Sequence, residues 1–261
     1  MRGYVSTRWG QLHYSSAGEG DQAFVLLHET PLNHAAFQRL VPLLADEYRV
    51  VAFDSPGYGE SDGPAGPSTA EEYAKTLTEG IDALGLDHVI LYGVHTGGTF
   101  AVQLAATLGD RSDGLALTGV PYYTEEVRLA RRVRQIPPTA DDGSHLLDSF
   151  QWEPAAYDAE ARSRLVAGIA ADPHHGYQAF HAVYGYQPGQ HLTQISAPVL
   201  LVSHPQDPLY DFDNRFRGDV PQAGQVIIDT ERLPVYWTAP DQVAAALKSL
   251  AADGAKQRVS P

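Results

Sequence analysis

The 261-residue chain contains no cysteine. Disulfide bonds, thiolate metal ligands and a cysteine nucleophile are therefore excluded together. No apolar run approaches the roughly 18 residues that a membrane-spanning helix requires. The first residues, Met1 to Ser6, show no basic segment followed by an apolar stretch and a small-residue cleavage site. We therefore expect a soluble, cytoplasmic protein with neither a signal peptide nor a membrane partner.

Basic residues are also scarce. The chain carries 18 lysines and arginines against 32 acidic residues, which gives a formal net charge of −14. Nucleic acids and anionic membrane surfaces both require basic patches, so neither is an expected partner. The apolar fraction of 43% and the charged fraction of 19% are ordinary for a globular protein. A small molecule is the expected partner, and the composition does not indicate an oligomeric state.

Short apolar runs alternate with helix-like stretches along most of the chain. Strands that alternate with helices form a mostly parallel, doubly wound α/β sheet through right-handed crossovers. The predicted strands cover residues 23–28, 49–53, 88–92, 115–120, 198–203 and 225–228, with an antiparallel edge hairpin at 4–7 and 11–14. Apolar residues at helical spacing predict helices at 35–44, 69–84, 99–108 and 241–251. The tail from 254 to 261 is expected to fray.

Two segments carry further local signals. Ser68-Thr69-Ala70-Glu71-Glu72 offers a capping box at the start of the second helix, and Gly85 ends that helix. From Pro121 to about Gln194 the chain is rich in aromatic and charged residues and contains no strand-like run. We interpret 121–194 as a helical lid over a core formed by 1–120 and 195–261.

The strongest motif is the turn after the strand at 88–92. It reads Gly93-Val94-His95-Thr96-Gly97-Gly98 and leads into a helix. This turn resembles the G-x-S-x-G elbow of the α/β-hydrolase superfamily, in which a sharp strand-to-helix turn projects the middle side chain into the site. The middle residue here is His95, where the family has serine.

Three other segments carry the same resemblance. His28-Glu29-Thr30-Pro31 is similar to the family's H-G-x-P oxyanion loop, and residues 53–62 match its D-x-P-G-x-G-x-S turn. The strand and loop at 198–208 resemble those that deliver the family's catalytic acid, which makes Asp207 the matching carboxylate. The resemblance implies an α/β-hydrolase fold over nearly the whole chain.

The family's catalytic histidine has no counterpart. It precedes the final helix, whose start is marked by Thr238-Ala239-Pro240-Asp241, and counting back from that start places Leu233 at the position of the histidine. Residues 229–237 contain no histidine, so a small shift of register does not restore one. Both the nucleophile and the base of a serine hydrolase are therefore missing.

The remaining groups suit general acid-base chemistry. Histidine has an unperturbed pKa near ~6.5, and the helix N-terminus after His95 is expected to favour the neutral, proton-accepting ring. Asp207 would orient that ring, Glu29 would relay or donate a proton, and the Thr96 N–H would bind an oxyanion. Each carboxylate also has a purely structural alternative to a catalytic role. Glu29 could be a solvated loop carboxylate, and Asp207 could cap a loop.

Further residues are candidates for substrate binding. Tyr177, His181 and Tyr184 share one face of a predicted helix, which is either core or the wall of a cavity for a bulky, apolar or conjugated substrate. The other candidates are the loop residues Thr30 and His28 and the lid residues His145 and Trp152. His28 could instead pack or bind backbone.

No metal or cofactor is expected. The chain has no H-x-x-x-H or H-E-x-x-H pattern on a predicted helix of the catalytic region and no G-x-G-x-x-G turn after its first strand.

The sequence leaves three hypotheses for the function. The first is cofactor-free elimination, isomerisation or cyclisation of a small apolar metabolite by His95, in the manner of tailoring enzymes of secondary metabolism. The second is hydrolysis of an ester, lactone or epoxide with His95 activating water, and the third is a non-catalytic protein that binds a ligand.

Overall fold

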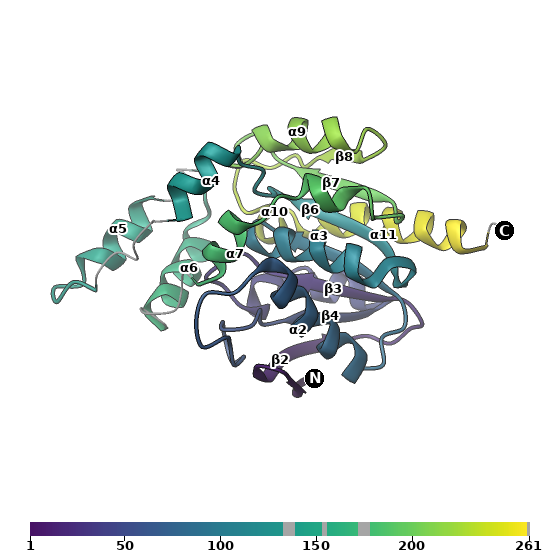
Figure 1. The fold of residues 1–261 in the computed structure, drawn as a ribbon, viewed down its shortest axis with the longest axis horizontal. Helices are drawn as coiled ribbons and strands as arrows, with labels where there is room; N and C mark the ends of the chain where they lie inside the picture. The colour runs from purple at the N-terminus through teal and green to yellow at the C-terminus, as the bar shows by residue number, and fades with distance from the viewer. Residues whose placement is uncertain (133–138, 153–155, 172–177, 260–261) are drawn as a thin grey trace.

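The computed structural model describes residues 1–132, 139–152, 156–171 and 178–259. These ranges build a central sheet with helices around it (Figure 1). The sheet has eight strands in the order β1-β2-β4-β3-β5-β6-β7-β8. The strands are β1 (Arg2–Thr7), β2 (Gly10–Ala17), β3 (Ala23–Leu27), β4 (Arg49–Phe53), β5 (Val89–Val94), β6 (Ser112–Thr118), β7 (Val199–Ser203) and β8 (Gly224–Ile227). Strands β1 and β2 form an antiparallel edge, and the strands from β4 to β8 pair in parallel. The predicted α/β-hydrolase architecture is confirmed.

Helices cover both faces of this sheet, which explains why every residue of β3, β5 and β6 is buried. On one face α2 (Ala70–Ala83) packs against α3 (Thr96–Leu108), and on the other α1 (Val41–Ala45) packs against α11 (Pro240–Val259). The predicted capping box is present in α2, where the Thr69 side chain accepts from the Glu72 N–H and the Glu72 carboxylate accepts from the Thr69 N–H.

Two predicted segments differ from the structure. The helix expected at 35–44 is divided into the 3-10 turn η1 (His34–Phe37) and α1, which has Pro42 in its first turn, because proline lacks the N–H that a continuous helix would use there. The prediction that the tail frays from residue 254 was wrong up to Val259, because α11 continues to that residue. Gly254 packs directly against the Asp113 backbone of β6, a contact that any side chain would block.

Helices between β6 and β7 form a cap at the carboxyl ends of the strands (Figure 1). They are α4 (Glu125–Arg132), α5 (Ser144–Trp152), α6 (Ala159–Ala171), α7 (Gln178–Gly185) and α8 (Gly189–Leu192). The cap is tied to the core at several points, one of which is the Ala179 N–H that donates to the Tyr58 hydroxyl at 3.0 Å. The boundaries at 121 and 194 stay predictions.

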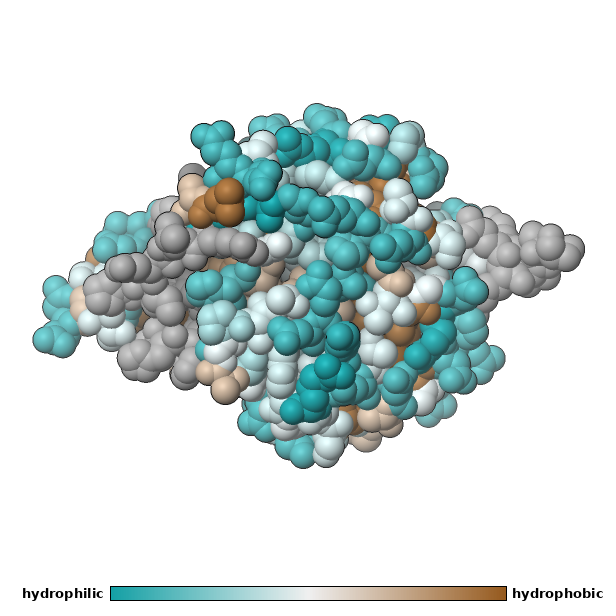
Figure 2. All heavy atoms as spheres, viewed as in Figure 1, coloured by the Kyte–Doolittle hydropathy of each residue, from teal (hydrophilic) through white to brown (hydrophobic). Residues whose placement is uncertain are grey.

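The remaining short elements are η2 (Gly109–Arg111), α9 (Asp211–Asp219) and α10 (Val235–Thr238). On the face drawn in Figure 2, the coloured surface is mostly hydrophilic, with small apolar areas between the polar side chains. In the described part of the chain, no helix combines the length and apolar character needed to cross a bilayer.

Candidate active site

His95 stands at the tip of the turn that joins β5 to α3. Its φ of 46° and ψ of −110° make it the one non-glycine residue with positive φ in the described ranges. This conformation is costly for a residue with a side chain and marks a site where the surrounding structure holds the backbone in place. The His95 N–H donates to the Thr118 carbonyl at 2.9 Å, and its carbonyl accepts from the Thr99 N–H at 3.1 Å. The turn therefore presents the imidazole at the carboxyl edge of the sheet.

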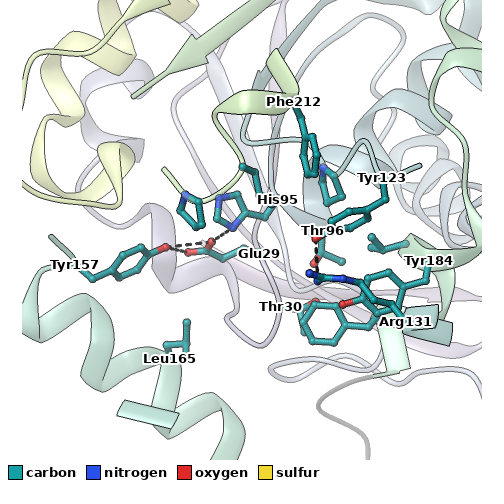
Figure 3. A pocket seen from close by; sticks show the side chains of 15 residues that line it. Glu29, Thr30, His95, Thr96, Tyr123, Arg131, Tyr157, Leu165, Tyr184 and Phe212 are labelled. Atoms are coloured by element: carbon teal, nitrogen blue, oxygen red, sulfur yellow. Dashed lines mark hydrogen bonds and ion pairs between the residues drawn. The ribbon is translucent and has the colours of Figure 1, made fainter. Parts of the chain in front are cut away.

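The imidazole of His95 contacts a carboxylate at each ring nitrogen. Nδ1 points toward Glu29 (Figure 3) and lies 2.8 Å from its Oε2. Nε2 lies 3.0 Å from Oδ2 of Asp207. The side chains are 17%, 4% and 7% exposed for His95, Glu29 and Asp207, so all three groups are largely shielded from water. Glu29 follows β3 and Asp207 follows β7, so the carboxyl ends of parallel strands bring the three side chains together. We call this set the Glu29–His95–Asp207 array.

The two carboxylates determine the charge of the ring. Burial by itself lowers the pKa of His95, but Asp207 and Glu29 outweigh it and raise the pKa well above 6.5. Burial raises the pKa of each carboxyl, and the interactions with His95 outweigh it in turn, so both pKa values are lowered. The array is an imidazolium between two carboxylates. The expectation that the helix N-terminus keeps His95 neutral was therefore wrong, because two adjacent negative charges exceed the effect of a helix dipole.

Two phenols complete the surroundings of Glu29. The Tyr236 hydroxyl donates to Oε1 at 2.6 Å, and the Tyr157 hydroxyl lies 3.1 Å from Oε1 and 3.3 Å from Oε2. Tyr236 belongs to α10, and Tyr157 belongs to the cap. Neither was singled out from the sequence. Tyr236 stands three residues after Leu233, in the segment where the family has its catalytic histidine. This position in the chain was the one feature of the sequence that could have indicated Tyr236 as a site residue.

Leu233 is buried, with 1% of its surface exposed, and its backbone pairs with the cap. The Leu233 N–H donates to the Ala156 carbonyl at 2.9 Å, and its carbonyl accepts from the Asp158 N–H at 2.7 Å. These two hydrogen bonds hold Tyr157 beside Glu29. The position that the family resemblance assigns to histidine is thus part of the hydrophobic core and an attachment point of the cap.

Gly119 provides the space in which His95 meets Asp207. Its φ is +60°, and a Cβ atom at this position would lie 2.6 Å from Cδ2 of His95 and 2.8 Å from Oδ1 of Asp207. Real Cβ atoms do not approach other heavy atoms so closely. The contact between the imidazole and Asp207 therefore depends on glycine at 119.

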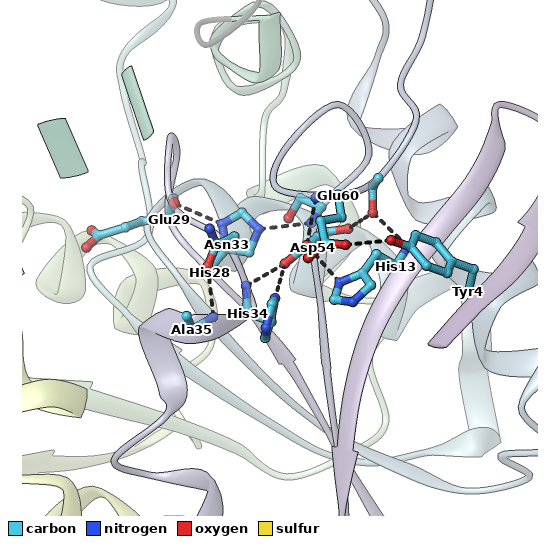
Figure 4. Close-up of polar contacts among 11 residues, drawn as sticks. Tyr4, His13, His28, Glu29, Asn33, His34, Ala35, Asp54 and Glu60 are labelled. Carbon is cyan, nitrogen blue, oxygen red and sulfur yellow. Dashed lines mark hydrogen bonds and ion pairs between the residues drawn. The ribbon is translucent and has the colours of Figure 1, made fainter. Parts of the chain in front are cut away.

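His28 supports the loop that carries Glu29 (Figure 4). Its Nδ1 lies 2.9 Å from the Glu29 carbonyl oxygen, and its Nε2 accepts from the Ser55 N–H at 2.9 Å. Burial lowers the pKa of His28, which fits a neutral ring with one donor and one acceptor nitrogen. His28 is not among the residues that line the cavity described below, so this geometry favours the alternative of backbone binding.

His13, His34 and Asp54 form a second cluster beside this loop, with potential ligand atoms within 4.8 Å of one another. Both rings direct Nδ1 at the Asp54 carboxylate, at 2.8 Å and 2.7 Å, and the His34 and Glu60 N–H groups donate to it as well. Burial raises the pKa of Asp54, but the hydrogen bonds from the His34 ring and from the His34 and Glu60 N–H groups lower it to about 2. The carboxylate is fully occupied as a hydrogen-bond acceptor that fixes two loops (Figure 4).

A cavity of about 330 Å³ opens beside the array. Of the site residues predicted from the sequence, those that line the cavity are Glu29, Thr30, His95, Thr96 and Tyr184. Asp207 lies behind His95, while its neighbours Pro208 and Leu209 line the wall. The sequence did not indicate the other lining residues, which are Pro121, Tyr123, Arg131, Tyr157, Leu165, Phe180, Val183 and Phe212.

The substrate-binding residues predicted in the lid have different outcomes. Tyr177 and the Trp152 side chain lie outside the described residues. His145 accepts from the Ala140 N–H at 3.2 Å within the cap and does not line the cavity. His181 does not line it either, because the face of α7 that meets the cavity carries Phe180, Val183 and Tyr184. The Phe180 and Tyr184 rings stack with their centres 5.9 Å apart. The helix therefore has an aromatic face, but of the predicted residues this face includes Tyr184 and not His181.

The family model of the alpha/beta hydrolase fold matches residues 22–182. The chain belongs to the α/β-hydrolase fold family. It is 31% identical over 220 residues to 2-hydroxy-6-oxononadienedioate/2-hydroxy-6-oxononatrienedioate hydrolase 2 of Pseudomonas putida, covering 74% of this chain and 73% of the relative. It is also 31% identical over 141 residues to haloalkane dehalogenase 2 of Mycobacterium tuberculosis, covering 52% and 49% of the two chains.

Solved structures show the same fold. A thermophilic esterase from Thermogutta terrifontis has a TM-score of 0.77 at 22% identity, covering 97% of this chain and 99% of its own. The enol-lactonase from Burkholderia xenovorans LB400 has a TM-score of 0.74 at 21% identity, covering 97% and 100%. At these identities the similarity establishes the architecture alone. The relatives identify the chain as an enzyme of a hydrolase family.

Proposed function

We propose that this protein is a hydrolase without a covalent intermediate, in which the Glu29–His95–Asp207 array activates water against an ester, a lactone or a similarly activated carbonyl compound. The observation that carries the proposal is the pair of carboxylates on the two nitrogens of His95. An imidazolium has no free lone pair, so His95 can neither attack a substrate nor take a proton from water. The hydrolase relatives support the reaction class.

Glu29 is the base in this scheme, because it is the carboxylate of the array that lines the cavity. A water molecule bound at Glu29 transfers a proton to the carboxylate while its oxygen attacks the carbonyl carbon. The Thr96 N–H, in the first turn of α3, stabilises the negative charge on the carbonyl oxygen. When the intermediate collapses, the carbon–oxygen bond to the leaving group breaks, and the leaving group takes the proton from Glu29.

His95 serves as a fixed positive charge in this reaction. While Glu29 is ionised, the imidazolium holds it in place and lowers its pKa. Once Glu29 has taken a proton, Asp207 continues to neutralise His95, so the site never contains an unpaired buried cation. Asp207 is thus a positioning residue, and Glu29 is the catalytic one.

Proton transfer without water is the second candidate, and one observation favours it. Glu29 and the Tyr157 hydroxyl both line the cavity and face the same space (Figure 3). A carboxylate base beside a phenol acid suits elimination, isomerisation or ring closure. The aromatic and aliphatic walls suit a small, largely apolar substrate in both cases.

Turnover in water enriched in oxygen-18 separates these candidates. With p-nitrophenyl esters and lactones as the substrate panel, hydrolysis must place the heavy oxygen in the acid product, and intact-protein mass spectrometry must show no acyl adduct at early times. Glu29→Gln should abolish turnover. The control is Glu79→Gln, which removes a surface carboxylate that pairs with Arg8 and should leave turnover unchanged. A trapped adduct, or full activity in Glu29→Gln, would refute the mechanism. Binding without turnover would favour a ligand-binding protein.

A further inference from the structure

Arg131 gives the cavity a second charged end. It belongs to α4, and among the described residues that line the cavity it is the one lysine or arginine. Figure 3 shows it with Tyr123 and Tyr184, on the opposite side of the cavity from Tyr157. The array at the catalytic end carries two carboxylates and one imidazolium, which leaves one negative charge there. The cavity is therefore electrically polarised along its length.

The guanidinium of Arg131 is held by aromatic rings and not by acids. It lies 4.6 Å from the centre of the Tyr123 ring and 5.9 Å from that of Tyr184, and its Nη1 donates to the Tyr123 hydroxyl at 3.3 Å. A guanidinium carries more N–H donors than these two phenols can use, so donors of Arg131 remain to bind a planar anion. No ion pair among the described residues includes Arg131, although the chain contains 32 acidic residues.

Arg164 of the cap shows the contrasting arrangement. It also stacks on an aromatic ring, 4.7 Å from the centre of Trp237, but it pairs with Glu160 at 3.3 Å and does not line the cavity. Its charge is paired with a carboxylate of the same helix, which Arg39 also contacts, whereas that of Arg131 faces the substrate space.

We infer that Arg131, with Tyr123 and Tyr184, is a carboxylate subsite, and that the substrate is an organic acid whose apolar or conjugated body extends from this subsite to Glu29. The inference rests on the proposed function only in treating the cavity as the substrate site. The negative charge of the array repels a carboxylate from the catalytic end, and Arg131 attracts it at the other. The substrate is thereby oriented with its reacting carbonyl toward Glu29.

Binding of benzoate and of benzamide to the full-length protein tests the subsite. The two probes have the same shape and differ in charge, and calorimetric titration measures each affinity without turnover, so failure here is distinguishable from failure of the hydrolytic mechanism. Because the Arg131 side chain is partly exposed to water, we expect benzoate to bind roughly fivefold more tightly at low salt. Arg131→Met should abolish this preference, and Arg164→Met should preserve it.

Three outcomes would overturn the proposal. The first is that benzoate does not bind, and the second is that it binds no better than benzamide. The third is that Arg131→Met retains the preference, which would place the anion away from Arg131. A preference that declines as sodium chloride is raised from about 20 to about 500 mM, and that is already absent in Arg131→Met at low salt, supports the subsite.

Discussion

The Nδ1 atom of His95 lies 2.8 Å from Oε2 of Glu29, and this contact changes what the elbow can do. An elbow residue ordinarily acts by attacking or by accepting a proton. With a carboxylate at each nitrogen, His95 retains its proton and transmits its charge to the groups around it. The reactive position in the cavity is consequently Glu29.

Removing one carboxylate should lower the pKa of His95. In Glu29→Gln and in Asp207→Asn the ring loses one of the two negative charges that raise its pKa, while the burial that lowers it remains. We expect the pKa to fall toward 6.5 in each variant. The measurement is a titration followed by nitrogen-15 NMR of histidine side chains. Glu79→Gln is the control, and an unchanged His95 titration in both variants would show that the ring is not controlled by these carboxylates.

The two phenols on Glu29 should have separable roles. Tyr157 lines the cavity and Tyr236 does not, although both hydroxyls reach the carboxylate. Tyr236→Phe should reduce the free energy of unfolding by about 1–3 kcal/mol, because a buried hydrogen bond to a charge is lost. Tyr157→Phe should additionally reduce kcat by about 100-fold if its proton is used in the reaction.

The control for the phenols is Tyr73, whose buried hydroxyl has no hydrogen-bond partner among the described residues. Tyr73→Phe should change neither stability nor kcat appreciably. Equal kcat in wild-type protein and Tyr157→Phe would assign Tyr157 to the support of Glu29 alone.

Gly119→Ala should disrupt the contact between His95 and Asp207. Gly85 has nearly the same φ, +63° against +60°, but nothing lies within 4 Å of the place that a Cβ atom would take there. Gly85→Ala therefore measures the cost of the backbone conformation alone, roughly 1 kcal/mol. Denaturant unfolding should show a loss for Gly119→Ala that exceeds this by about 1–3 kcal/mol. Equal losses in the two variants would mean that the array tolerates a side chain at 119.

The array should stabilise the fold over a definite pH range. Since the pKa of His95 is raised, its contribution is complete below 6.5 and is lost as the pH rises through the folded-state value. Since the pKa values of Glu29 and Asp207 are lowered, their contributions are complete above 4.5 and 3.8 and are lost at more acidic pH. The difference in unfolding free energy between wild-type protein and His95→Gln should therefore be largest between about pH 4.5 and 6.5. A difference that is independent of pH would contradict the charged array.

The sequence predicted the sheet, the elbow and the convergence of His95, Glu29 and Asp207, because each lies at the end of a strand with a strong local pattern. It did not predict Tyr157, Arg131 or the orientation of α7. The cap has no strand register to fix its residues, and long-range pairings such as that of Leu233 with the cap leave no local pattern. The charge of His95 was misjudged for the same reason, since it depends on distances between residues far apart in the chain.

The backbone pairing of Leu233 with residues 156–158 has a mechanical consequence. This side of the cap cannot lift from the core without breaking both hydrogen bonds and withdrawing the Tyr157 hydroxyl from Glu29. Cap movement and the ionisation of Glu29 are therefore coupled, because an open cap removes a donor that stabilises the carboxylate. Opening on this side would both withdraw a hydrogen-bond donor from Glu29 and admit water to it, so the cover of the cavity also sets the surroundings of its base.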